Sequence, residues 1–255
     1  MSQTERTGLH TLDTSVGINK HIDLEKRIIF ALDVETVDEA KEWVYKLEDS
    51  IKFYKVGLQL FLAGWFNIID WIVKRGHEVM VDLKFFDVPQ TVSSAVAQLK
   101  GRGISFATVH GNDAILKAAA QAKHDVKILA VTVLTSLDEG DMRDLGFQCN
   151  PEQLVLSRAR RALEAGCDGV VSSGLEAPKL RKELGNNFLV IVPGVRPIAN
   201  REDDQKRVVD VRMAFLNGAD YVVIGRPIRK APNPSALVRA MHEEIRAGLA
   251  GVAGS

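Results

Sequence analysis

Hydrophobic and polar positions change along this 255-residue chain in blocks, and not residue by residue. About eight short runs of apolar or β-branched residues recur, most of them followed by a segment long enough for a helix. These runs are Arg27–Asp33, Lys52–Gly57, Val79–Lys84, Ile104–His110, Ile128–Thr135, Gly169–Ser173, Phe188–Gly194 and Tyr221–Arg226. Continuous apolar strands that alternate with helices are typical of a parallel sheet covered by helices.

Roughly eight such units within about 220 residues favour a closed (β/α)8 barrel, the TIM-barrel form of the α/β class, over an open doubly wound sheet. No GxGxxG follows the first strand, which weakens a dinucleotide-binding alternative. We therefore expect one barrel domain over residues 27–247. Residues 1–26 are expected to form a loosely ordered extension, and residues 248–255 a small-residue tail. Within the barrel, the pattern predicts a helix from Thr36 to Leu47.

Composition excludes several classes of partner. The 33 basic residues balance the 33 acidic ones, so no global field attracts nucleic acid or an anionic membrane, and an anion site must be local. The most apolar window, Phe61–Val73, is interrupted by Asn67 and Asp70 and is too short to span a bilayer. The first residues lack the apolar core of a signal peptide. With only Cys149 and Cys167, the chain suits a reducing compartment, and we expect it in the cytoplasm.

Polar residues recur at one end of the apolar runs. Each lies at or near the C-terminal end of its run, which in a (β/α)8 barrel is the end that carries the active site. Scattered surface polarity would not keep this phase along a whole chain. The residues are Asp33, Lys55, Asp82, Lys84, His110, Thr135, Ser172, Gly194 and Arg226.

The first three strands place four charges near one another, Asp33, Lys55, Asp82 and Lys84, with Asp87 in a short loop beyond. In a regular strand Asp82 and Lys84, two residues apart, point the same way. Lysines that alternate with acids stay protonated, which suits a general acid. A Schiff-base aldolase, which needs a neutral lysine, is disfavoured. Burying such a cluster costs desolvation energy, so it is rarely kept for stability.

Two further segments predict anion binding at the same face. Gly225 allows close backbone approach after the last strand, and Arg226 can hold a phosphate with two parallel hydrogen bonds. The long polar loop Gly194–Lys206 could close over a ligand and exclude water. Within this loop, Arg196 and Gln205 are the better candidates for ligand contact. Together they indicate a phosphorylated substrate.

The sequence gives little support for a catalytic histidine or a metal site. His110 faces the mouth of the barrel, yet we interpret it as structural or as a second layer behind the catalytic groups. His77 and His124 are interpreted as ordinary surface residues. A metal site at the acids near Asp82 is not expected, because Lys84 lies between them and would repel a cation.

The stretch DLKFFDVPQTV at 82–92 resembles the Asp-x-Lys-x-x-Asp-Ile-Pro-Asn-Thr signature of the orotidine 5'-phosphate decarboxylase family. The bacterial members match best. Val88 replaces the isoleucine and Gln90 the asparagine, and both departures leave the charged residues untouched. The resemblance covers about residues 27–247. Its other segments are ALD at 31–33, KVG at 55–57, VTVLTS at 131–136, PGVRP at 193–197 and IGRPI at 224–228.

The resemblance implies decarboxylation of orotidine 5'-monophosphate to UMP and CO₂ without a cofactor or a metal. It implies that Lys84 donates a proton to C6 of the pyrimidine and that Asp82 lies against the substrate carboxylate. Lys55 and Asp87 would complete the charge array. It also implies a homodimer, in which Asp87 and Thr91 enter the active site of the neighbouring subunit. The substrate contacts implied are Asp33 and Lys55 on the ribose, Thr135 on the pyrimidine, and Arg196, Gln205, Gly225 and Arg226 on the phosphate.

Two alternatives stay open from the sequence. A sugar-phosphate decarboxylase of the 3-keto-gulonate 6-phosphate type shares the Asp-x-Lys-x-x-Asp core but uses Mg²⁺. The Pro89-x-Thr91 sequence and the spacing of Arg196, Gln205 and Arg226 favour the nucleotide substrate. The second alternative is an inactive barrel that only binds a UMP-like ligand or a partner. An intact charge array argues against it, because an inactive protein need not keep a costly cluster.

Overall fold

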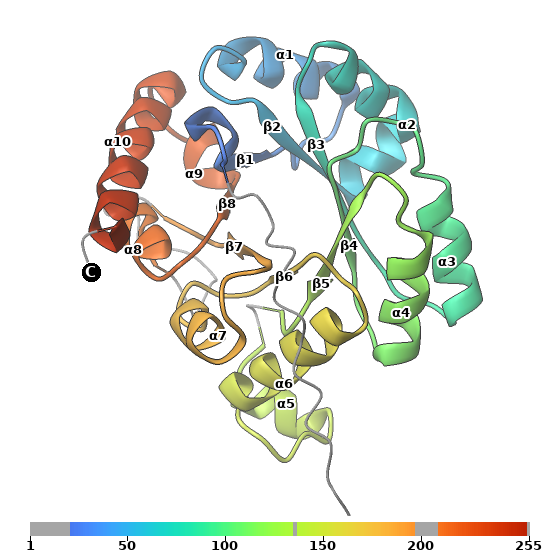
Figure 1. The fold of residues 1–255 in the computed structure, drawn as a ribbon. Helices are drawn as coiled ribbons and strands as arrows, with labels where there is room; N and C mark the ends of the chain where they lie inside the picture. The colour runs from blue at the N-terminus through green and yellow to red at the C-terminus, as the bar shows by residue number, and fades with distance from the viewer. Residues whose placement is uncertain (1–20, 135–136, 197–208, 254–255) are drawn as a thin grey trace, which may run out of the picture.

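Each apolar run forms a strand of one closed parallel barrel in the computed structural model, which describes residues 21–134, 137–196 and 209–253 (Figure 1). The strands follow chain order, and β1 pairs with β8 to close the barrel. The predicted (β/α)8 architecture is confirmed. The strands are β1 Ile28–Ala31, β2 Phe53–Gly57, β3 Glu78–Phe85, β4 Phe106–Val109, β5 Lys127–Val131, β6 Gly169–Val171, β7 Leu189–Pro193 and β8 Tyr221–Ile224.

Helices surround the barrel on its outside (Figure 1). The first of them shows why they form: the Thr36 side chain caps it by accepting the backbone N–H of Glu39, and Ala40, Val44 and Leu47 make a buried stripe at helical spacing. The helix predicted here is confirmed. The helices are α1 Val37–Leu47, α2 Leu58–Lys74, α3 Pro89–Ala97, α4 Asp113–Ala122, α5 Glu139–Asp144, α6 Pro151–Glu164, α7 Ala177–Leu184, α8 Val211–Leu216, α9 Arg226–Arg229 and α10 Pro234–Ala253.

Two hydrophobic cores result from the alternation of side chains along the strands. On β1, Phe30 points outward and joins the core shared with the helices, whereas Ile29 points into the barrel. The interior contains a cluster of three aromatic rings, Phe53, Phe106 and Tyr221, whose centroids lie 5.0 to 5.7 Å apart. Both faces of most strands are therefore buried, which explains the continuous apolar runs.

The N-terminal ends of the strands carry a repeated aspartate clamp. Asp168, just before β6, accepts the backbone N–H of Ile128 on β5 at 2.8 Å and pairs with Lys123, which caps the C-terminal end of α4. Asp220, just before β8, accepts the N–H of Val190 on β7 at 2.8 Å and pairs with Arg181 of α7. Each clamp fixes a strand, the preceding strand and an outer helix, at the end of the barrel opposite the mouth.

Secondary structure is present beyond both ends of the predicted range 27–247. Within the expected extension, Leu24–Lys26 forms a 3-10 turn, and Ile22 packs against the barrel interior. Leu24 packs against the outer core; residues 1–20 lie outside the described part of the chain. At the other end, α10 continues to Ala253, so the predicted tail 248–255 is helical as far as that residue. This last part of α10 packs closely on α8, since a Cβ at Gly248 would lie 2.8 Å from the carbonyl oxygen of Arg212.

One histidine differs from its predicted place. His77 is buried, with 6% of its surface exposed, and the prediction that it lies on the surface is wrong. Its ring packs edge-on against Tyr54 at 5.3 Å, and its Nε2 lies 3.3 Å from Glu48 at the end of α1. Packing between α1 and β2 therefore sequesters it. His124 is exposed as predicted.

The second helix is interrupted. Trp65 has φ 48° and ψ −142°, which breaks the helical backbone within α2. The preceding residue lies close to α1, since a Cβ at Gly64 would come within 2.5 Å of Val37. The helical pattern of the sequence did not reveal this break. Among the residues described, no helix combines the length and the apolar character that a membrane crossing requires.

Candidate active site

A cavity of about 260 Å³ opens at the C-terminal ends of the strands. Its walls come from strands on both sides of the barrel, with apolar residues such as Met80, Val131 and Val171 between the polar ones. Most of the residues that the sequence placed at the strand ends line it. The candidates that line it are Asp33, Lys55, Asp82, Lys84, Ser172, Gly194, Arg196, Gly225 and Arg226.

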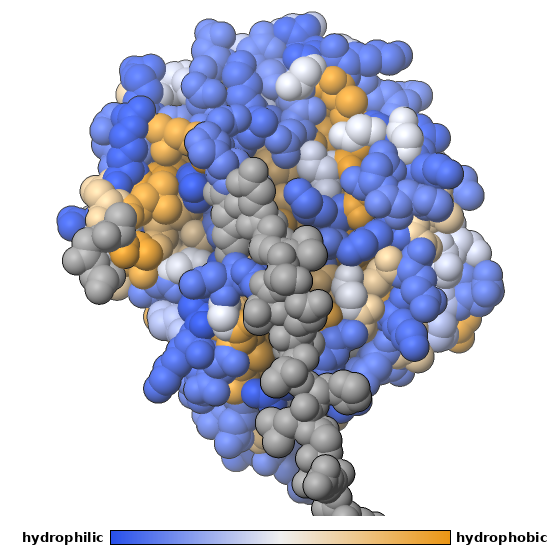
Figure 2. All heavy atoms as spheres, viewed as in Figure 1, coloured by the Kyte–Doolittle hydropathy of each residue, from blue (hydrophilic) through white to orange (hydrophobic). Residues whose placement is uncertain are grey.

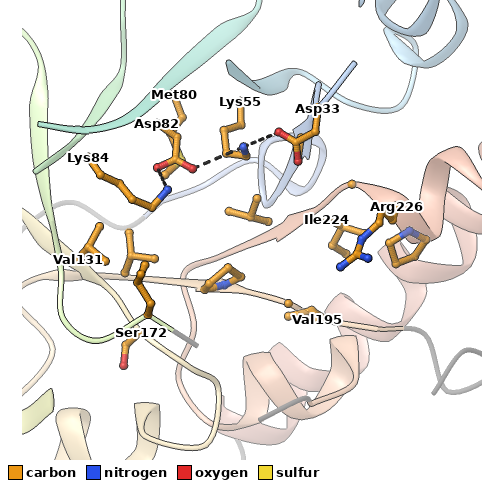
Figure 3. Close-up of a pocket in the computed structure, with 18 of the residues that line it drawn as sticks. Asp33, Lys55, Met80, Asp82, Lys84, Val131, Ser172, Val195, Ile224 and Arg226 are labelled. Atoms are coloured by element: carbon orange, nitrogen blue, oxygen red, sulfur yellow. Dashed lines mark hydrogen bonds and ion pairs between the residues drawn. The ribbon is translucent and has the colours of Figure 1, made fainter. Parts of the chain in front are cut away.

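Four charged side chains form a row along one wall of the cavity (Figure 3). The Nζ atom of Lys55 lies 2.9 Å from Oδ1 of Asp33 and 3.5 Å from Oδ2 of Asp82. The Nζ atom of Lys84 lies 2.8 Å from Oδ1 of Asp82. The row thus alternates in sign, and each oxygen of the Asp82 carboxylate faces a different ammonium group. The predicted charge array is present.

Asp82 is held in its charged form. Burial raises the pKa of this carboxyl, but the charges of Lys55 and Lys84, with hydrogen bonds from Lys84 and Thr108, outweigh burial and lower the pKa below its usual value. An ionised carboxylate only accepts hydrogen bonds. Asp82 therefore anchors the two lysines and has no proton to donate.

Two glycines give the site its room. A Cβ at Gly57 would lie 3.0 Å from Nζ of Lys55 and 3.3 Å from Oδ1 of Asp33, so a side chain there would press on the first ion pair. A Cβ at Gly225 would lie 3.0 Å from the Cβ of Ala31, so β8 could not approach β1 so closely. Both positions lie at the ends of strands that line the cavity.

The third strand does not keep a regular alternation where it carries the charges. Its pairing with β4 shifts register between Val81, opposite Ala107, and Phe85, opposite Val109. Three residues of β3 thus span a length for which β4 uses one, which is a bulge. Lys84 lies in the bulge with φ 48°, an unusual value for a residue with a side chain. The expectation of a regular strand is wrong, although the contact it predicted between Lys84 and Asp82 is present.

The residue of β4 opposite the bulge is Thr108, which the sequence analysis did not single out. Its buried hydroxyl accepts the backbone N–H of Lys84 at 3.0 Å and donates to Oδ1 of Asp82 at 2.9 Å. The only sequence signal was a hydroxyl-bearing residue inside an apolar strand, two positions before His110. Such residues are common in strands, so the signal has little specificity.

The candidate phosphate site lies at the end of the cavity far from Lys84. Gly225 precedes the short helix α9 and Arg226 begins it, next to the Asp33 end of the charge row (Figure 3). Arg196 follows β7, is buried and lines the same cavity. Two other predicted contacts, Gln205 and Thr135, lie outside the described residues.

Asp87 and Thr91 lie away from the cavity of their own chain. Asp87 is exposed in the predicted short loop between β3 and α3, where its Oδ1 accepts the N–H of Val88 at 2.6 Å. Thr91 is exposed in the first turn of α3. Within one chain, neither residue joins the charge row.

His110 also lies outside this cavity. Its Nδ1 is 3.0 Å from the carbonyl oxygen of Val131, and its ring packs against Phe86 at 5.4 Å between centroids. Burial lowers the pKa of His110, with the Val131 hydrogen bond acting in the opposite direction, so the ring is neutral near pH 7. In the described ranges, no three His, Cys, Asp or Glu side chains come together as ligands for a metal ion.

Similar proteins align over most of the chain. The orotidine 5'-phosphate decarboxylase of Methylococcus capsulatus is 59% identical over 230 residues, which span 89% of this chain and 95% of the relative. The orotidine 5'-phosphate decarboxylase of Xanthomonas euvesicatoria pv. vesicatoria is 47% identical over 227 residues, which span 88% of this chain and 93% of the relative. These alignments extend well beyond the active-site motifs.

A solved structure with a similar fold and a family model both point to the same kind of enzyme. The crystal structure of orotidine 5'-phosphate decarboxylase from Lactobacillus acidophilus matches with a TM-score of 0.77 and 33% identity, covering 87% of this chain and 100% of that chain. The model of the orotidine 5'-phosphate decarboxylase / HUMPS family matches residues 26–241. The chain therefore belongs to the orotidine 5'-phosphate decarboxylase / HUMPS family, as a carboxy-lyase of the orotidine 5'-phosphate decarboxylase type.

Proposed function

We propose that the chain converts orotidine 5'-monophosphate to UMP and CO₂ in pyrimidine biosynthesis, with Lys84 as the proton donor and without a cofactor. The observation that carries the proposal is the row of alternating charges, which has Lys84 at one end of the cavity and Arg226 beyond its other end. A nucleotide placed between them has its base near Lys84 and its phosphate near Arg226.

The chemistry requires stabilisation of a localised anion. When the bond between C6 and the carboxylate breaks, the electron pair stays on C6 in the plane of the ring, where the π system cannot absorb it. A fixed ammonium group beside C6 stabilises this developing charge, which is the general effect of preorganised electrostatics. The Nζ atom of Lys84 then transfers its proton to C6, CO₂ leaves, and water returns a proton to the lysine.

Asp82 has a positioning role in this proposal. Its carboxylate holds the Lys84 ammonium at 2.8 Å and faces that of Lys55 at 3.5 Å, so it fixes the direction of both lysine side chains. The substrate carboxylate would lie beside Asp82, and its departure relieves the repulsion between the two anions. We assign most of the effect to positioning, because the aspartate is already compensated by two cations.

The remaining contacts divide the substrate between the two ends of the cavity. Asp33 and Lys55, whose side chains meet at 2.9 Å, suit the ribose hydroxyls. Thr135 would contact the pyrimidine. Guanidinium and backbone N–H groups suit a phosphate, which we assign to Arg196, Gln205, Gly225 and Arg226. Binding energy from the distant phosphate can be used to orient the ring, so these residues should affect turnover as well as affinity.

We further propose a homodimer that shares its active sites. Asp87 and Thr91 are exposed, and the same loop exposes the large apolar side chains of Phe86 and Val88, 66% and 62% of whose surfaces are accessible. Apolar residues that flank a predicted catalytic acid suit a protein interface. Contact through this loop would carry Asp87 to the partner's charge row. Figure 2 shows that the face in view is mostly hydrophilic, with apolar residues in separate areas.

The cytoplasm is the compartment that we propose for this reaction. Cys149 and Cys167 are both free thiols, which suits reducing conditions.

The experiment that tests the function follows the ultraviolet absorbance of orotidine 5'-monophosphate with purified protein and excess EDTA. Loss of the substrate band, with UMP as product, is expected. If the nucleotide is unchanged while 3-keto-gulonate 6-phosphate is consumed only with Mg²⁺, the proposal fails and the sugar-phosphate reaction replaces it.

A further inference from the structure

The bulge of β3 lacks the regular backbone pairing that fixes the rest of the strand. Asp82, Leu83 and Lys84 lie between two paired positions, and on β4 only Thr108 lies between the partners of those positions. A bulge leaves residues unpaired and bends the strand. The two charged residues proposed to act at the reacting carbon therefore lie where β3 loses its regular pairing with β4, although Asp82 still pairs with Gly57 of β2.

The Thr108 side chain supplies the missing connection. A hydroxyl has one donor and can accept two hydrogen bonds, and here it accepts the main-chain N–H of Lys84 and donates to Asp82. Oδ1 of Asp82, which receives this bond, also receives the bond from Nζ of Lys84. One buried hydroxyl thus joins the backbone of Lys84 to the carboxylate that holds its side chain.

Lys84 needs such support. A backbone with positive φ at a residue other than glycine persists only where the surroundings enforce it. The N–H of Lys84 is bound by Thr108 at 3.0 Å, and this bond opposes relaxation of the bulge toward an ordinary strand. Relaxation would turn the lysine side chain away from its present direction.

We propose that Thr108 is a positioning residue, whose hydroxyl fixes the bulge of β3 so that Lys84 and Asp82 keep the arrangement needed for proton transfer to C6. This inference rests on the proposed decarboxylation. Thr108 is fully buried behind the cavity wall and acts only through the two charged residues.

The test compares Thr108→Val, which removes the hydroxyl but keeps the shape, with Thr108→Ser, which keeps the hydroxyl. Thr132→Val is the matched control, since Thr132 is also buried at a strand end but donates to the carbonyl of Val171. In single-turnover measurements Thr108→Val should react about 10- to 100-fold more slowly, as expected for loss of a hydrogen bond to a charged group. Thr108→Ser should recover most of the rate. UMP affinity should change less than about threefold in all three variants, because Thr108 holds the reacting groups and not the phosphate.

A pH profile separates positioning from a general loss of structure. Asp82 is faced by Lys55 from β2, Lys84 from its own strand and Thr108 from β4, with Asp33, which follows β1, behind Lys55. Without the hydrogen bond from Thr108, the protonated form of the Asp82 carboxyl becomes more favourable. The acid limb of the rate-against-pH profile of Thr108→Val should therefore move to higher pH. The acid limbs of the Thr108→Ser and Thr132→Val profiles should coincide with that of the wild type. Ionisations of the substrate are common to all variants.

A Thr108→Val variant with the wild-type rate and pH profile overturns the inference. If this variant does not fold, Thr108→Ser and Thr108→Ala give the same comparison, because both lack the methyl group and differ only in the hydroxyl. Equal rates for that pair also overturn it. Failure of the wild type to form UMP contradicts the proposed function itself, whereas the ratio between variants of an active enzyme tests Thr108 alone.

Discussion

The Nζ atom of Lys84 lies 2.8 Å from Oδ1 of Asp82, although the strand between them is bulged. The contact orients a side chain that has four rotatable bonds. Because the other oxygen of Asp82 faces Lys55, rotating Lys84 away would leave the charges in the row unbalanced. A cation held in this way needs little reorganisation when negative charge develops beside it, which is the condition for electrostatic catalysis.

Replacing Lys84 by alanine should lower turnover by at least about 1,000-fold, since the variant loses both the proton donor and the nearest positive charge. The fold should be retained, because Lys84 is partly exposed at the mouth. Absorbance assays measure turnover, and circular dichroism checks the fold. Lys100→Ala, at an exposed lysine outside the cavity, is the control and should stay active. Substantial activity in folded Lys84→Ala would refute the mechanism.

Arg226→Ala should weaken UMP binding about 10- to 100-fold while leaving uridine binding nearly unchanged, because a guanidinium bonds strongly to phosphate. Isothermal titration with both ligands measures this difference. Lys230→Ala, at the exposed end of α9, removes a positive charge outside the cavity lining and should preserve the preference for UMP. Equal losses for nucleotide and nucleoside would place the phosphate elsewhere.

Mixing two inactive variants tests the shared active site. If Asp87 serves the partner's site, a dimer of one Lys84→Ala chain and one Asp87→Ala chain has one site with both native residues. Random reassociation should then restore about a quarter of the wild-type activity. The control pairs Lys84→Ala with Asp82→Asn, which lie in the same chain's row, and should restore none. No recovery with Asp87→Ala would show that the sites are not shared in this way.

His77→Gln should make stability less sensitive to acid. Burial is the main cause that lowers the pKa of His77, and it outweighs the hydrogen bond with Glu48, which raises it. The unfolded chain therefore binds a proton more readily, so the wild type loses stability as pH falls below about 6.5, the ordinary histidine value. Between pH 7 and 5.5 the variant should lose less unfolding free energy, by up to about 1 kcal/mol, in urea titrations. His124→Gln, at an exposed position, should keep the wild-type slope.

The barrel could be predicted from the sequence because a strand that is buried on both faces appears there as an uninterrupted run of apolar residues. Interior residues such as Ile29 and outward ones such as Phe30 are both apolar, so every strand appears as a continuous run. Lys55 and Asp82 could likewise be placed at one face, because all parallel strands end at the same side of the sheet.

What the sequence could not reveal depends on local backbone geometry. The positive φ of Lys84 and the break at Trp65 occur at residues that do not favour them, so no turn or glycine signal marks them. Thr108 has an ordinary residue type for a strand, and its role follows from the bulge opposite it. His77 looked exposed because its neighbours in sequence are polar, whereas Tyr54, which covers it, is distant in the chain.

The aspartate clamps before β6 and β8 have a consequence for how this chain can change over time. Asp168 and Asp220 hold main-chain N–H groups at the base, so these bonds do not depend on which side chains occupy the mouth. Substitutions in the loops that select a substrate therefore leave these bonds intact. Evolution can test new specificities at one end of the barrel while the other end preserves its architecture.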